Sequence, residues 1–137
     1  MNMTKPGNDK AMRAFWLSLA ARWTKVPGFT WQVGMRDRLG DVVESVTDTQ
    51  INWRNSFGLR AASLRSARLY HPDLEHMPSV AVLAAQVYRA EGTAHITHDE
   101  ASREYRSWDC FGREVSSRYY AEVLVELLEA QQRKAQK

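Results

Sequence analysis

Cysteine is nearly absent from this chain, since Cys110 is the only cysteine among 137 residues. A single thiol cannot form an intrachain disulfide, and it excludes zinc sites that need two or more thiolates. Long apolar runs are missing as well. Arg13, Arg22 and Lys25 interrupt the first 25 residues, which therefore fit neither a secretory signal nor a membrane span. These absences predict a protein of the reducing cytoplasm that has no membrane partner.

Sequence signatures of catalysis are also missing. The chain contains no GxGxxG and no GxxxxGK(S/T) motif, so neither of the common phosphate-binding loops is expected. Cys110 would need a neighbouring histidine base to act as a nucleophile, whereas Trp108 and Phe111 close to it indicate a buried, inert thiol. We therefore expect no enzymatic activity, no catalytic residue and no cofactor.

The histidines form one pattern that metal sites also use. His95 and His98 lie close together and are followed by Asp99 and Glu100, and divalent metals bind such side chains. However, Thr97 and Glu100 form a capping box, which predicts a helix that begins after His95. The positive end of the helix dipole then stabilises Asp99 and Glu100 in the first turn, which explains these acids without a metal. We therefore expect no metal site.

The apolar residues recur mostly with helical spacing. The clearest case is the stretch 10–24, where one face of a helix would carry Met12, Phe15, Trp16, Leu19 and Trp23. No convincing alternation of apolar and polar residues is present, although a strand over 29–35 is the alternative to a helix there. Further helices are expected over 31–46, 59–70, 80–89, 97–108 and 113–132, with a capped helical turn over 47–58.

Together these segments predict an all-α protein, a single-domain bundle of about six helices. Residues 1–8 are expected to form a flexible leader, residues 9–132 the helical domain, and residues 133–137 a frayed tail. A chain of 137 residues is long enough to bury a sizeable core in one domain.

Arginine is the most distinctive component of the sequence, because it supplies 14 of the 19 basic residues while the net charge is only +3. One group lies in a 15-residue stretch without any acid, and a second group lies among aromatic residues nearer the C-terminus. Such groups can follow a phosphate backbone, although solvated faces with salt bridges are the alternative interpretation. The predicted nucleic-acid-binding residues are Arg54, Arg60, Arg65 and Arg68 in the first group, and Arg103, Arg106, Arg113 and Arg118 in the second.

The aromatic residues near the second group support a different interpretation. Arginine, tryptophan and tyrosine also dominate the energetics of protein interfaces. The alternative function is therefore a protein-binding adaptor or inhibitor that docks on a larger host complex. Its predicted partner-binding residues are Tyr105, Trp108, Tyr119 and Tyr120.

A succession of short motifs lies between Val46 and Gly92. It consists of Thr49-Gln50, Gly58-Leu59-Arg60, Met77-Pro78-Ser79, Ala85, and Arg89 to Glu91. This succession resembles phage replication proteins of the lambda P type, which load the replicative helicase of the host, although the segment His71 to His76 is inserted relative to them. The resemblance implies a protein of a phage or mobile element that contacts a helicase beside single-stranded DNA. The sequence thus predicts a small non-enzymatic helical protein that binds nucleic acid or works within a nucleic-acid machine.

Overall fold

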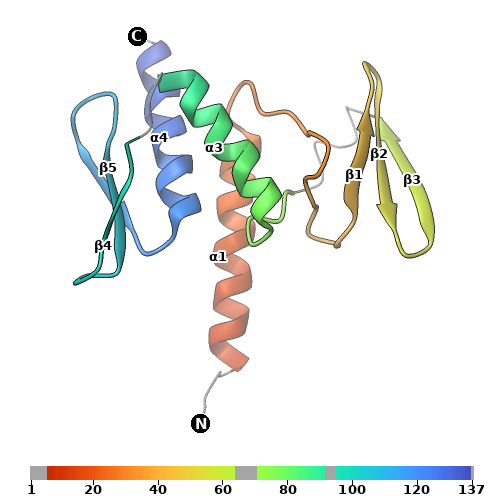
Figure 1. Ribbon diagram of the computed structural model, residues 1–137, viewed down its shortest axis with the longest axis horizontal. Coiled ribbons are helices and arrows are strands. Elements are labelled where there is room, and N and C mark those ends of the chain that lie inside the picture. The colour runs from red at the N-terminus through yellow and green to blue at the C-terminus, as the bar shows by residue number, and fades with distance from the viewer. Residues whose placement is uncertain (1–5, 64–70, 92–94, 137) are drawn as a thin grey trace.

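The computed structural model describes residues 6–63, 71–91 and 95–136, and within them the protein is a mixture of helices and strands (Figure 1). Three helices and six strands are present in this part of the chain, and the strands form two separate three-stranded antiparallel sheets. The predicted all-α bundle of six helices is therefore wrong. Figure 1 shows the helices at the centre, with one sheet on each side of them.

The three helices are α1 (Pro6–Thr24), α3 (Met77–Glu91) and α4 (Tyr120–Ala135). The helices predicted over 10–24 and 80–89 are confirmed, and both extend further than expected. The last predicted helix is correct only from Tyr120 onward, because the residues just before it form a strand. Residues 6–8 of the predicted leader and 133–135 of the predicted tail are helical.

The first sheet contains β1 (Val42–Val46), β2 (Gln50–Asn55) and β3 (Gly58–Ser63) in that order. Helices over 31–46 and 59–70 and a helical turn over 47–58 were predicted here, and the described part of each is wrong. Residues 31–41 form loops rather than the predicted helix or the alternative strand. Gly34 and Gly40 adopt φ angles of 96° and 95°. A helix does not allow such angles, and residues that carry a side chain rarely adopt them.

Buried and half-buried residues alternate along β2, which explains why this segment is a strand. Ile51 and Trp53 are fully buried, whereas Arg54 is exposed. The hairpin to β3 turns at Asn55, whose side-chain Oδ1 accepts the N–H of Phe57 at 2.7 Å. The rest of the helix predicted over 59–70, from residue 64 onward, lies outside the described residues.

The second sheet contains β4 (Thr97–Asp99), β5 (Glu104–Trp108) and β6 (Glu114–Ser117) in that order. The helix predicted over 97–108 is wrong, because the predicted capping box is instead the start of a hairpin. The side chain of Asp99 accepts the N–H of Ala101 at 3.0 Å, and Arg103 adopts a φ of 58° that closes the turn. Acidic and small polar residues favour such turns as readily as they favour helix starts.

A single hydrophobic core joins the helices to the first sheet and to β6. Its fully buried side chains include Trp23 of α1, Trp53 of β2, Leu83 of α3 and Leu124 of α4. A ladder of edge-to-face rings connects α1 to the first sheet through the loop after the helix. Its successive centroid distances are 4.8 Å from Trp23 to Phe29, 5.6 Å from Phe29 to Trp31, and 4.7 Å from Trp31 to Trp53.

Within the described ranges, no helix has both the length and the apolar character needed to cross a membrane.

Candidate functional site

An aromatic groove of about 490 Å³ lies where α1, the start of α3, β5 and the start of α4 meet. Three of the four predicted partner-binding residues line it, namely Tyr105, Tyr119 and Tyr120, and so does Arg118 from the second arginine group. The remaining walls come from residues that the sequence did not single out for this role: Trp16, Leu74, Met77, Val80 and Ala121. We call this site the aromatic groove.

Two clusters of rings meet at the aromatic groove and contribute part of its lining. In the first, Tyr119 packs against Phe15 and Trp16 of α1, with ring centroids 4.9 Å and 5.3 Å away. In the second, Tyr105 of β5 packs against Tyr120 at 5.5 Å and against His98 of β4 at 4.7 Å. Tyr119 and Tyr120 are adjacent in the chain, yet each ring belongs to a different cluster.

The corner between β6 and α4 holds these two tyrosines in place. Ser117 donates a hydrogen bond from its Oγ to the Glu122 carboxylate at 2.5 Å and accepts the N–H of Tyr119 at 3.0 Å. The backbone of Tyr119 is extended, and its carbonyl oxygen accepts the N–H groups of Glu122 and Val123 at the start of α4. The rings therefore extend from a hydrogen-bonded corner rather than from a free loop.

Two exposed side chains give the aromatic groove its outward chemistry. Met77, on the first turn of α3, is 70% exposed, which is unusual for a large apolar residue. Arg118 is exposed, and no carboxylate lies within ion-pair distance of it among the residues that the structure describes. A flexible thioether and an available guanidinium beside rings can hold both apolar and acidic groups.

The first arginine group does not form one surface in its described part. Arg60 pairs across the hairpin with Trp53, on the face that meets the core, whereas Arg54 pairs with Leu59 and lies on the other face. Arg60 contacts the buried Asp37 and Asp41 at 2.9 Å and 2.6 Å. Arg54 instead forms a fork with the exposed Glu44. Arg65 and Arg68 lie outside the described residues.

The second arginine group is only partly paired. Arg106 lies 3.6 Å from Asp99 and 3.4 Å from Glu114, and Arg113 lies 3.6 Å from Asp109. Arg103 is exposed at the β4–β5 turn, where no described carboxylate pairs with it. Arg54 and Arg60 lie in the first sheet and Arg106 lies in the second, and Figure 1 shows these two sheets on opposite sides of the helices. Nucleic-acid binding by these residues stays a prediction.

Trp108, the fourth predicted partner-binding residue, lies outside the aromatic groove. It ends β5 opposite Glu114 and is 55% exposed. Phe111 follows in the turn, where the Arg113 guanidinium lies 5.1 Å from its ring centroid. Cys110 in the same turn is only partly buried, so the prediction of a buried thiol is wrong.

The histidine pattern near β4 does not assemble a ligand set in the structure. His98 packs its ring on Tyr105, and His95 is exposed just before the strand. Across the described ranges, no three histidine, cysteine or acidic side chains are grouped so that they could hold a metal ion.

Three acidic residues on α4 surround Arg22 of α1. Arg22 pairs with Glu129 at 2.6 Å and lies 4.0 Å from Glu122. Burial raises the pKa of Glu126, which lies between them on the same helix, and the neighbouring charge of Glu122 raises this pKa further. Ionisation of Glu126 therefore costs more free energy in the folded protein than in the unfolded chain.

We expect Glu126→Gln to raise the free energy of unfolding at neutral pH. A carboxyl group whose pKa is higher in the folded than in the unfolded state lowers the free energy of unfolding as the pH rises from the unfolded-state pKa to the folded-state pKa. Glutamine does not ionise, so it removes this loss. The gain should stay below about 1 kcal/mol, because the group is partly solvated, and should vanish below about pH 4. Urea unfolding of both proteins across this pH range measures it. Glu129→Gln is the control and should instead be destabilising, because it breaks the ion pair with Arg22.

Comparison with known proteins finds no counterpart: the sequence matches no protein-family model and no curated protein, and the fold matches no solved structure. The resemblance to helicase loaders therefore stays a prediction. In the structure, that segment runs from the end of β1 through β2 and β3 to α3.

Proposed function

We propose that this protein is a non-enzymatic binding module that docks on a partner protein by taking an acidic, apolar segment into the aromatic groove. The observation that carries the proposal is the convergence of Tyr105, Tyr119 and Tyr120 with the exposed Met77 and Arg118 around one concave site. Residues from four separate elements meet there.

The shape and chemistry of the aromatic groove fit a short protein segment. Rings packed against each other keep a fixed shape, so little side-chain entropy is lost when they bind. The exposed thioether of Met77 adapts to an apolar side chain, and Arg118 can form a charge-assisted pair with a carboxylate. We therefore expect the bound segment to carry a large apolar residue next to Asp or Glu.

A protein partner is favoured over nucleic acid by what surrounds the other arginines. Arg54, Arg60, Arg106 and Arg113 all lie within 4 Å of a carboxylate, so a phosphate would have to displace an existing partner. A phosphate backbone is best followed by a continuous cationic surface. Arg118 is instead a single cation beside apolar rings, which is typical of the centre of a protein interface.

Selection from a display library of short random peptides tests the proposal. We expect enriched peptides that pair an aromatic or aliphatic residue with an acid. The variant Arg118→Glu should lower the affinity for these peptides by about 10-fold or more, because a charge-assisted hydrogen bond contributes roughly 1.5–3 kcal/mol. The same variant should enrich for peptides with Lys or Arg in place of the acid. Fluorescence anisotropy with labelled synthetic peptides measures both effects.

Arg103→Glu is the matched control, because it makes the same charge change at an exposed arginine outside the groove lining. It should leave peptide affinity within about twofold of wild type, because Arg103 does not line the groove and the effect of an exposed charge is screened by salt. The proposal fails if no peptide family is enriched, or if both variants weaken binding equally. A labelled oligo(dT) serves as the competing probe. If it binds with a steep salt dependence that Arg118→Glu abolishes, the groove is a nucleic-acid site instead.

A further inference from the structure

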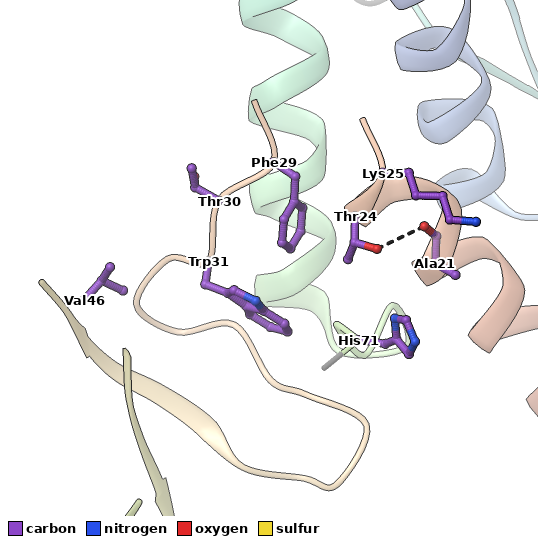
Figure 2. Close-up of a pocket in the computed structure, with 8 residues that line it drawn as sticks. All are labelled: Ala21, Thr24, Lys25, Phe29, Thr30, Trp31, Val46 and His71. Atoms are coloured by element: carbon purple, nitrogen blue, oxygen red, sulfur yellow. Dashed lines mark hydrogen bonds between the residues drawn. The ribbon is translucent and has the colours of Figure 1, made fainter. Parts of the chain in front are cut away.

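A second cavity, of about 610 Å³, lies between the end of α1, the loop that follows it, the end of β1 at Val46, and His71 in the segment before α3 (Figure 2). In Figure 2 the rings of Phe29 and Trp31 extend from the loop toward Thr24 and His71. This cavity shares no described lining residue with the aromatic groove. Its volume falls within the range of about 300–1,000 Å³ that is typical of small-molecule sites.

The aromatic wall of this cavity is fixed before any ligand arrives. Phe29 and Trp31 are the two middle members of the ring ladder that begins at Trp23 and ends at Trp53, and both end members are fully buried. Trp31 itself is only 7% exposed. A ring held on both sides cannot rotate away, so the wall offers a flat apolar surface of constant shape.

The opposite side of the cavity has one cationic residue, Lys25, whose exposed, flexible side chain extends away from the two rings in Figure 2 and can rotate toward a bound anion. Lys25 and His71 line it, and the described lining contains no carboxylate. No described acidic group lies within ion-pair distance of Lys25. Burial lowers the pKa of His71, and the charges of Arg38 and Lys25 lower it further, so this imidazole adds no positive charge of its own at neutral pH. The hydroxyl of Thr24 donates to the carbonyl of Ala21 at 3.0 Å and can still accept a hydrogen bond.

We propose that this cavity binds a small, flat, apolar molecule that carries one carboxylate, with its body against Phe29 and Trp31 and its anionic group at Lys25. The ring wall suits the apolar part, because aromatic molecules stack edge-to-face or offset on such rings. The uncompensated ammonium group suits the carboxylate. This inference does not depend on the aromatic groove, and either proposal can fail without the other.

Titration of isotope-labelled protein with 2-naphthoate, followed by amide and indole resonances, tests this site. We expect saturable shifts at Lys25, Phe29 and Trp31, with a Kd of about 0.1–1 mM for a ligand of this size. Lys25→Gln should lower the affinity for 2-naphthoate by about 5- to 10-fold, because the ion pair is lost while the apolar contact is kept. The same change should leave the affinity for the neutral analogue 2-naphthalenemethanol unaltered.

Lys10→Gln is the matched control, because it removes the same charge from an exposed position on the same helix. It should leave the affinity for 2-naphthoate unchanged. Several results would overturn the proposal: no saturable shift, shifts confined to residues of the aromatic groove, or equal loss of affinity in both lysine variants. Equal binding of the acid and the neutral analogue by the wild-type protein would also overturn it.

Discussion

Replacement of Arg60 by methionine is expected to lower the free energy of unfolding by about 3–5 kcal/mol at neutral pH. The guanidinium of Arg60 donates to Asp37 at 2.9 Å and to Asp41 at 2.9 Å and 2.6 Å, and it lies 5.1 Å from the Trp53 ring centroid. The Asp37 side chain is only 1% exposed. Without Arg60, two carboxylates would stay in a buried site with no cation between them, which is among the most destabilising changes in a protein core.

The same variant should recover part of this loss in acid. Burial raises the pKa of Asp37, the nearby charge of Asp41 contributes to the increase, and Arg60 opposes it. Removal of Arg60 therefore raises the folded-state pKa of Asp37 further above its unfolded value. A group with this sign of shift destabilises the protein above its folded pKa, and the penalty is relieved as the pH falls through that value. As the pH falls, the difference in free energy of unfolding between Arg60→Met and wild type should therefore become smaller, which urea unfolding at several pH values measures.

Arg54→Met is the control for Arg60→Met, because it breaks an arginine–carboxylate fork on the neighbouring strand. That fork is exposed, with side-chain exposures of 60% for Arg54 and 39% for Glu44. Exposed pairs contribute at most about 1 kcal/mol, so this variant should stay close to wild type. Equal losses in the two variants would mean that burial of Asp37 and Asp41 does not determine the cost.

The second large effect is expected for Trp23→Ala, at about 3–5 kcal/mol. Trp23 is fully buried and donates its indole N–H to the Gln86 side chain at 2.8 Å. It is also the first ring of the ladder, and its ring packs edge-to-face against Phe29. Alanine would leave a cavity between α1 and α3 and deprive Gln86 of its donor. Thermal and urea unfolding, with circular dichroism to confirm that the variant still folds, measure the cost.

Trp108→Ala is the control for Trp23→Ala, because it removes the same side chain from a position that is 55% exposed. Its cost should be below about 1 kcal/mol, as is usual for surface substitutions. If both tryptophan variants lose equal stability, the ladder is not a major part of the core.

The sequence was sufficient to predict the helices that have a long apolar face, but not the sheets. Met12, Phe15, Leu19 and Trp23 share one face over several turns, and α1 forms there. By contrast, Trp31 and Met35 have helical spacing but reach the core from an irregular loop, so their spacing carries no information about a helix. Short strands of three to six residues show too few alternations to stand out, and β6 with four residues is an example.

Of the aromatic residues in the candidate site, only the tyrosines were among the functional residues predicted from the sequence, and the location of the site was not predicted. Tyr105, Tyr119 and Tyr120 were expected to bind a partner, and the structure places all three around one groove. Trp16 and Met77 were missed, because the contact between them and the tyrosines depends on how distant elements pack. One signal was available for Trp16. Adjacent helical residues point about 100° apart, so a helix that carries both Phe15 and Trp16 turns one ring toward the edge of its apolar face.

The split of Tyr119 and Tyr120 between two ring clusters has a consequence for the proposed binding role. Because consecutive residues carry the two rings, a displacement of the backbone at this corner would move both rings together. Such a displacement would also disturb the hydrogen bond between Ser117 and Glu122. For the proposed role, we therefore expect segments that fit the resting groove to bind best.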